Sequence, residues 1–254
     1  MPKGDLFVIT KTEIVVFKAI DYSESSQITT VLSRKHGKIS LIAKGSRKPK
    51  SRFAGKLQPG NLLDVVYYFK PTRSVQTLSE AEYRARLDTL TTDLEKMALA
   101  MSALELTEQM VHENEVNEPV YQFISDFLVW LNEQKSIKRT LFPYLQLRLA
   151  RLSGLELQID PGQPESGTGT GYLNVESGTV SWNNPTEKAL KLSNNQMKFL
   201  QKSAISKNRS LLNQNMENGE IKELVNHLDR YLRYHVEGLR PRRTDAIFDQ
   251  LLKS

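Results

Sequence analysis

The feature that most constrains the fold of this chain is a change in the spacing of its apolar residues near residue 80. Before this point, short segments rich in Val, Ile, Thr and aromatic residues follow one another, which is typical of β-strands. After it, apolar residues recur at steps of three and four, the period of an amphipathic helix. The 254 residues therefore predict a two-domain α+β protein, with a β domain over residues 1–79 and a mostly helical domain over residues 80–254.

The β domain is expected to contain five strands, at residues 12–20, 27–32, 38–44, 62–69 and 74–79. In the third of these, Ile39, Leu41 and Ala43 share one face. Residues 45–60 are polar and carry Pro49 and Pro59, so a long loop is expected there. Five short strands followed by helices suit a small closed barrel better than an open sheet, whose edges would be unprotected.

The helical domain is expected to contain several amphipathic helices and one β insert. The first helix is expected to bury a single stripe, formed by Leu94, Met97, Met101 and Leu104. Further helices are predicted near residues 119–131, 141–152, 193–200, 221–232 and 245–252. A Gly- and Pro-rich insert lies near residues 158–186, and its strand-like segments 172–175 and 179–182 predict a hairpin.

Positive charge is concentrated in one stretch of the predicted β domain. Residues 1–78 contain 14 Lys and Arg against 5 Asp and Glu, whereas the rest of the chain contains 21 against 24. Residues 34–56 carry no acid and hold nine basic residues, which are Arg34, Lys35, Lys38, Lys44, Arg47, Lys48, Lys50, Arg52 and Lys56. A compact domain must bear the mutual repulsion of such a run, and a polyanion relieves it. Nucleic acid is the commonest polyanionic partner, although a solvated surface is the simpler alternative.

Aromatic side chains accompany this basic run. Phe53 lies within the predicted loop, and residues 67–69 place three aromatic rings on the next strand. A cationic groove with stacking rings is the usual way to bind single strands without regard to their sequence. We therefore predict a nucleic-acid-binding site formed by the nine cations and an exposed Phe53, while alternate strand residues such as Tyr67 and Phe69 are candidates for the core.

No pattern in the sequence indicates catalysis. There are no cysteines, and the four histidines fall in no zinc-binding motif. Neither a nucleophile elbow nor a complete phosphate-binding loop is present. A nuclease with an acidic metal site stays an alternative, but the five acids of the β domain show no motif spacing. We predict no catalytic residue, no metal and no cofactor, and the lack of a long apolar stretch indicates a cytoplasmic protein without membrane contact.

Several short motifs resemble the RecO family of bacterial recombination mediators. The likeness is most specific over residues 21–59, where it rests on Tyr22-Ser23-Glu24, Gly37-Lys38, Ala43-Lys44-Gly45 and Leu57-Gln58-Pro59. It continues through residues 78–82 and returns near the C-terminus at residues 232–235. The resemblance therefore spans most of the chain and is weakest in the helical middle.

Membership of this family implies a five-stranded OB-fold barrel followed by a helical domain. It implies binding of single- and double-stranded DNA, annealing of complementary strands, and help in loading RecA onto DNA coated by single-strand-binding protein (SSB). Implied partners are RecR, RecF, RecA and the acidic C-terminal tail of SSB. That tail docks on the helical domain of the family, where the basic candidates of this chain are Lys138, Arg139, Arg148 and Arg151.

The chain departs from the family pattern in the β insert. Many members of the family carry a four-cysteine zinc site there, whereas residues 160–185 of this chain contain none of its ligands. We expect the insert to hold together without zinc, through packing that involves Trp182. A remaining alternative is an RNA-binding or ribosome-associated OB-fold protein, because phosphate contacts are common to DNA and RNA.

Overall fold

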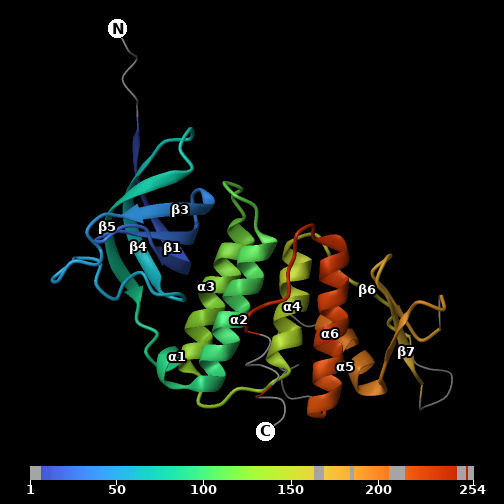
Figure 1. The fold of residues 1–254 in the computed structure, drawn as a ribbon. Helices are drawn as coiled ribbons and strands as arrows, with labels where there is room; N and C mark the ends of the chain where they lie inside the picture. The colour runs from blue at the N-terminus through green and yellow to red at the C-terminus, as the bar shows by residue number, and fades with distance from the viewer. Residues whose placement is uncertain (1–6, 163–168, 184–185, 206–214, 245–249, 251–254) are drawn as a thin grey trace. The chain divides into compact units, whose positions relative to one another are not determined.

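The computed structural model describes residues 7–162, 169–183, 186–205, 215–244 and 250. The chain divides into two compact units, Met1–Gln134 and Lys135–Ser254 (Figure 1). Among the described residues, the first unit holds five strands and three helices, and the second holds a small sheet and three further helices. The helix predicted over residues 245–252 lies outside the described residues, apart from residue 250.

The first unit begins with a five-stranded barrel whose strands are β1 (Val8–Asp21), β2 (Gln27–Ser33), β3 (Gly37–Ala43), β4 (Leu62–Phe69) and β5 (Val75–Ala85). The strands close in the order β1-β2-β3-β5-β4. The long β1 makes this possible, because its first half pairs with β4 and its second half pairs with β2. All five predicted strands are confirmed, and β5 extends six residues beyond its predicted end at residue 79.

The barrel core is built from alternate residues of each strand. On β3, Ile39, Leu41 and Ala43 all point inward and are at most 2% exposed, as the alternation predicts. The connection between β3 and β4 contains neither helix nor strand, and it inserts Phe53 and Leu57 into the same core. The predicted long loop is therefore fixed to the barrel by two buried side chains.

Three helices complete the first unit: α1 (Thr89–Thr92), α2 (Leu94–Met110) and α3 (Glu118–Glu133). The predicted start of α3 is confirmed, since the Asn117 side chain caps the helix by accepting a hydrogen bond of 3.0 Å from the Val120 amide. The predicted stripe of α2 is confirmed only in part, since Leu104 is buried and Met97 and Met101 are half-buried. Leu94 is 58% exposed, while small residues such as Ala98 and Ala103 are buried, because α2 packs against both β1 and α3.

The second unit contains α4 (Leu141–Leu152), α5 (Asn194–Ile205) and α6 (Asn218–His235). The predicted capping box at the start of α5 is confirmed: the Ser193 amide donates to Gln196 Oε1 at 2.8 Å, and the Gln196 amide donates to Ser193 Oγ at 3.2 Å. Helix α6 buries Leu224 and Leu228, as its apolar period predicts, and it packs against both α4 and α5.

The insert of the second unit forms a four-stranded sheet in the order β6-β8-β7-β9. Its strands are β6 (Gln158–Ile159), β7 (Gly171–Asn174), β8 (Thr179–Ser181) and β9 (Leu190–Leu192). The predicted hairpin is β7 and β8, whereas β6 and β9 are too short to leave a pattern in the sequence. Trp182 donates a hydrogen bond of 2.7 Å from its indole nitrogen to the Gly162 carbonyl, which ties the hairpin to the segment after β6.

Candidate nucleic-acid interface

The basic run of residues 34–56 lies at both ends of β3. We call the residues before and at its start the turn group, which is Arg34, Lys35 and Lys38. The residues after its end are the loop group, which is Lys44, Arg47, Lys48, Lys50, Arg52 and Lys56. Strand β3 is seven residues long, so Lys38 and Lys44 are separated by roughly 20 Å along it. The nine cations predicted as one site therefore lie toward both ends of β3, and the two groups differ in how far acids neutralise them.

Carboxylates of the same unit neutralise most of the turn group. Arg34 donates from Nε to Glu118 at 2.6 Å and from its guanidinium to Glu13 at 3.2 Å, and these interactions raise its pKa, with Glu118 the larger cause. Lys38 donates to the Glu108 carbonyl at 3.0 Å and lies 3.6 Å from the Glu113 carboxylate. Within the described chain, Lys35 has no ion pair.

The three carboxylates come from β1 (Glu13), the start of α3 (Glu118) and the connection between α2 and α3 (Glu113). The connection lies directly against the start of β3, where the Asn114 amide donates to the Lys38 carbonyl at 2.9 Å. Gly37 makes this approach possible, because a Cβ there would lie 1.9 Å from the Glu115 carbonyl oxygen. No local sequence pattern predicts the pairing of Arg34 with Glu118, because the two residues are 84 positions apart in the chain.

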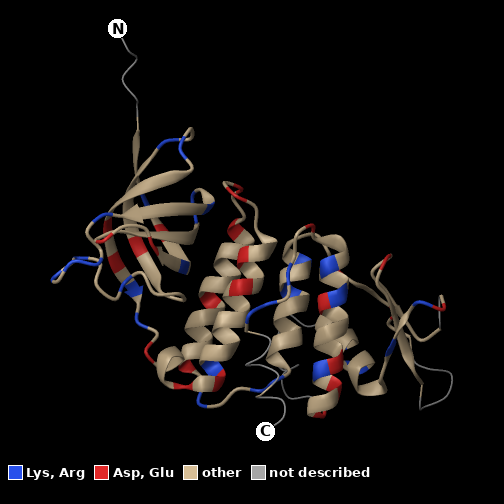
Figure 2. Cartoon of the chain, in the orientation of Figure 1, with Lys and Arg blue, Asp and Glu red and all other residues tan. Residues whose placement is uncertain are grey.

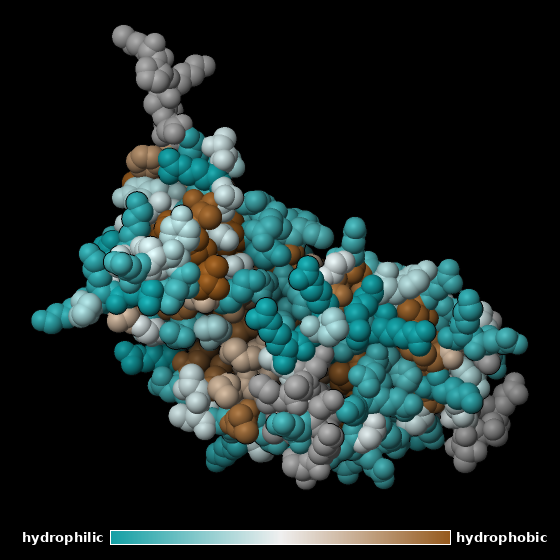
Figure 3. Space-filling model, in the orientation of Figure 1, coloured by the Kyte–Doolittle hydropathy of each residue, from teal (hydrophilic) through white to brown (hydrophobic). Residues whose placement is uncertain are grey.

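The loop group presents its charge to solvent. Lys44, Lys48, Lys50 and Arg52 are exposed, and none of them has an ion pair with a described residue. In Figure 2 the connection that carries them projects from the barrel as a basic segment, and Figure 3 shows the same projection covered by hydrophilic side chains. Such a cluster of unneutralised cations favours binding of a polyanion.

The other two members of the loop group anchor the connection. The Arg47 guanidinium donates to the Ser23 carbonyl at 2.9 Å and pairs with Asp21 at 3.3 Å. Lys56 donates to the Ala81 carbonyl at 2.7 Å and to Glu82 at 3.0 Å. Together with the buried Phe53, these contacts hold the exposed cations on a fixed scaffold.

The predicted aromatic contacts need correction. Phe53 is 3% exposed and belongs to the barrel core, so it cannot stack on a base. Tyr67 is fully buried, as its strand position suggests, and this burial raises its pKa to about 12. Phe69 is covered by His36, whose ring stacks on it with centroids 3.7 Å apart. Among the described barrel residues, the exposed rings are Phe7 and Tyr22.

His36 closes one end of the barrel through a small polar network. Its Nδ1 lies 2.6 Å from the Tyr67 hydroxyl, which in turn lies 3.2 Å from Ser33 Oγ. Burial, followed by the charge of Lys35, lowers the pKa of His36. A neutral imidazole accepts a hydrogen bond from the Tyr67 hydroxyl at Nδ1. The network therefore pairs these polar groups with one another inside the barrel.

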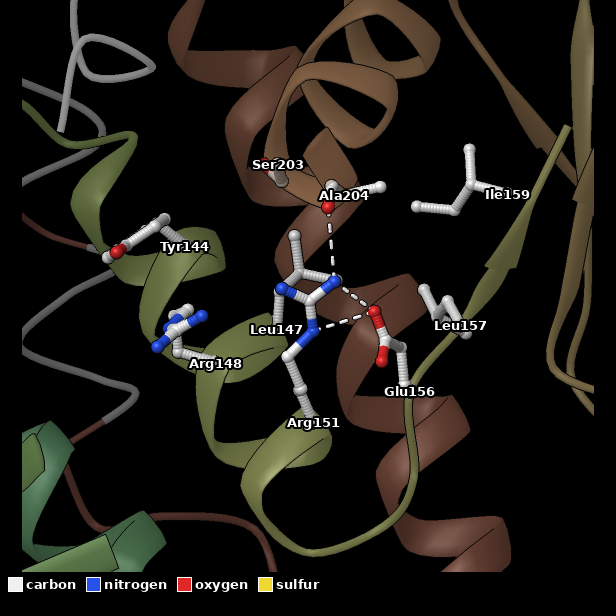
Figure 4. A pocket seen from close by; sticks show the side chains of 9 residues that line it. All are labelled: Tyr144, Leu147, Arg148, Arg151, Glu156, Leu157, Ile159, Ser203 and Ala204. Carbon is white, nitrogen blue, oxygen red and sulfur yellow. Dashed lines mark hydrogen bonds and ion pairs between the residues drawn. The ribbon is translucent and has the colours of Figure 1, made fainter. Parts of the chain in front are cut away.

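The basic candidates of the second unit fall into two pairs. Lys138 and Arg139 precede α4, whereas Arg148 and Arg151 lie on its second half and line a pocket (Figure 4). The pocket wall also contains the apolar side chains Leu147, Leu157 and Ile159. Arg151 donates to Glu156 at 2.6 Å and to the Ala204 carbonyl at 3.1 Å. The pocket therefore combines guanidinium groups with an apolar wall.

No three His, Asp or Glu side chains of the described residues are grouped in a way that would hold a metal ion. Nor does any helix in the described part of the chain have the length and apolarity to cross a bilayer.

Two protein-family models match the chain, and their boundary lies just after β5 rather than between the two compact units. Residues 8–86 match the family described as "Recombination protein O N terminal", and residues 91–245 match "Recombination protein O C terminal". The first match ends one residue after β5, so it corresponds to the barrel.

Several proteins similar to this chain carry the name "DNA repair protein RecO". The one from Salinibacter ruber is 35% identical over 173 residues, which is 68% of this chain and 66% of that protein, just under two thirds of its length. The one from Chloroherpeton thalassium is 29% identical over 260 residues, covering 96% of this chain and all of that protein. A third, from Chlorobium phaeobacteroides, is 33% identical over 60% of this chain and 58% of its own length. The chain belongs to the RecO family, whose function lies in DNA repair and recombination.

Proposed function

We propose that this protein is a DNA-binding recombination mediator without catalytic activity. It binds single- and double-stranded DNA, anneals complementary strands, and with RecR assists the loading of RecA onto SSB-coated DNA in the cytoplasm. In this proposal, residues 1–79 form the DNA-binding domain, and residues 80–254 form the domain that carries the insert and the partner contacts. The observation that carries the proposal is the group of exposed cations Lys44, Lys48, Lys50 and Arg52, which no described acid neutralises.

The barrel is proposed to be an OB-fold. Support comes from its strand order β1-β2-β3-β5-β4, from the long β1 that pairs with both β4 and β2, and from the parallel pairing of β3 with β5. Barrels of this type bind oligonucleotides through their loops and one sheet face. The loop group lies on the β3–β4 connection, which Arg47 ties to the β1–β2 loop, one of the ligand-binding loops of such barrels.

The proposed mechanism is electrostatic. Cations that contact phosphates release condensed counterions, and this release drives binding without regard to sequence. Two complementary strands held on such a surface repel each other less than they do in solution, so they pair faster. The turn group contributes little to DNA affinity in this scheme, because Arg34 and Lys38 already form ion pairs with Glu118 and Glu113.

The partner contacts are assigned to the second half of the chain. The pocket lined by Arg148 and Arg151 suits the acidic tail of SSB, because guanidinium groups bind carboxylates and the apolar wall accepts a nonpolar side chain. Lys138 and Arg139 lie outside this pocket and are held as secondary candidates. RecR, RecF and RecA follow from the family resemblance, and no surface is assigned to them.

An annealing assay tests the proposal. Complementary labelled oligonucleotides are mixed with the full chain, both naked and coated with cognate SSB. Annealing by the wild type is expected to fall at least several-fold in the variant Lys48→Ala, Lys50→Ala, Arg52→Ala. The matched control Lys188→Ala, Lys191→Ala, Lys198→Ala removes the same charge from exposed positions of the second unit and should anneal normally.

The same materials separate the alternatives. An Arg148→Ala variant is expected to anneal naked strands normally and to fail on SSB-coated strands. If the loop variant anneals like the wild type, the loop group is not the DNA site. If matched RNA displaces the DNA at lower concentration than DNA itself, the protein is an RNA-binding member of the OB-fold class.

A further inference from the structure

We propose that Tyr22 is a base-stacking site for single-stranded DNA, placed beside the cations of the loop group. The inference rests on the proposed function, because it names a contact within the same nucleic-acid interface. Tyr22 takes the role that the sequence predicted for Phe53, because Phe53 is buried and cannot contact a base.

The Tyr22 ring is held out into solvent by a fixed turn. It is 65% exposed, and its side chain has no hydrogen bond or ring contact with a described residue. Its own amide donates to the Ser26 carbonyl at 3.0 Å, which closes the turn between β1 and β2. The backbone that carries the ring is therefore fixed, while the ring itself is available.

Arg47 joins this turn to the loop group. Its amide donates to the Ser25 carbonyl at 3.1 Å, and its guanidinium donates to the Ser23 carbonyl at 2.9 Å. The same guanidinium pairs with Asp21, the residue before the ring. These three contacts place Tyr22 next to the segment that carries Lys44 and Lys48.

Local charge favours a base rather than a phosphate at the ring. Glu24 is exposed in the same turn and disfavours a phosphate there, whereas the loop group beyond Arg47 favours one. A single strand that crosses both segments thus meets phosphate contacts on the loop and an uncharged, stacking contact at the turn. Stacking on an aromatic ring tolerates any sequence, as a mediator requires.

The other rings of the barrel do not combine these properties. Phe53 and Tyr67 are buried, and Phe69 is covered by His36. Phe7 is exposed, but it packs edge-on against Tyr68 at 5.0 Å and lies at the opposite end of the 14-residue β1. Of the described aromatic residues, Tyr22 therefore fits the interface best.

Binding of two oligonucleotides of equal length, one of thymidines and one of abasic sugars, tests the proposal. Tyr22→Ala is expected to bind the thymidine strand about tenfold more weakly than the wild type, since base stacking supplies that much affinity. Tyr22→Trp should bind within about threefold of the wild type, because its ring also stacks. On the abasic strand, Tyr22→Ala and the wild type should bind alike. Tyr234→Ala, which removes an exposed ring of the second unit, is the matched control.

Several results would overturn the inference. Equal affinity of Tyr22→Ala and the wild type for thymidine strands would remove the stacking site, provided that thermal unfolding shows both to be folded. An equal loss on abasic strands would show that the substitution disturbs the loop rather than a base contact. The loop variant described above distinguishes the two proposals: if it binds normally while Tyr22→Ala does not, the loop-group assignment fails and the stacking site stands. A wild type that binds neither strand overturns both.

Discussion

At the scale of single residues, burial decides which charges belong to the structure and which can meet a ligand. Arg242 is 6% exposed, makes two contacts of 2.6 Å with the buried Asp229, and lies 4.7 Å over the Phe142 ring. Gln146 donates to the same carboxylate at 2.6 Å. This network ties the segment after α6 to α4 and α6, so Arg242 is a structural cation and contributes nothing to a DNA surface.

Replacing Arg242 by Met is expected to destabilise the second unit by about 3–5 kcal/mol, because Asp229 is left buried without its cation. Urea denaturation followed by circular dichroism measures the loss. Arg243→Met, at an exposed neighbour, should change stability by no more than about 0.5 kcal/mol. Adding Asp229→Leu to Arg242→Met should recover much of the loss; a loss that persists would mean that the guanidinium stabilises the unit by packing alone.

The pKa of His36 makes stability depend on pH. Because burial lowers that pKa in the folded state, the unfolded chain binds the proton more readily. Stability is therefore complete above the unfolded pKa of about 6.5 and falls as the pH decreases toward the folded value. The same holds for His227, whose pKa is also lowered by burial. Thermal midpoints of the wild type should fall between pH 7.5 and 5, and His36→Gln should fall less steeply; identical slopes would exclude His36 as a cause.

At the scale of elements, the start of α3 and the connection before it supply carboxylates that pair with cations at the start of β3. Glu118→Gln is expected to release Arg34 in part and to strengthen DNA binding, with a log–log salt slope steeper by up to about 0.7. Glu115→Gln removes an equal charge from an exposed residue that forms no ion pair with another described residue, so it controls for net charge. Affinity measured from 50 to 300 mM salt compares them, and equal slopes would contradict a screening role for Glu118.

The approach of this connection to β3 also gives a stability prediction. Gly37→Ala should destabilise the first unit by more than about 3 kcal/mol, because φ is +66° and the new Cβ would overlap the Glu115 carbonyl. Gly45→Ala has a similar φ of +73° but meets only Lys48 at 3.8 Å, so it should cost about 1–2 kcal/mol. The difference in thermal midpoint between the two variants measures the cost of the overlap. Similar losses of stability in both would show that backbone strain alone destabilises Gly37→Ala.

At the scale of the whole molecule, the number of available cations sets the response to salt. If all nine cations of the run contacted phosphates, the log–log slope on single strands would be about −6. With four to six exposed members, the structure predicts a slope of about −3 to −4. Fluorescence anisotropy over a range of salt measures it, and a slope near −6 would mean that DNA displaces Glu118 and Glu113 from the turn group.

Strand and helix positions were predictable where the pattern is local. The five barrel strands follow from alternation and β-branched content, and the helix starts at Asn117 and Ser193 follow from capping side chains. The stripe of α2 was predictable only in part, because the helix is packed on more than one side and small residues such as Ala98 and Ala103 become its contacts. Strands β6 and β9 were not predicted, because they are only two and three residues long.

The sequence by itself determined the family, the succession of five strands followed by a mostly helical region, and an excess of positive charge in residues 34–56. These properties depend on composition, spacing and short motifs, which are local. Only the tertiary structure decided that Arg34 and Lys38 are paired while Lys48 and Lys50 are exposed, and that Phe53 is buried while Tyr22 is not. The physical reason is that neutralisation and burial depend on which residues the fold brings together, and Glu118 meets Arg34 only because the α2–α3 connection packs against β3.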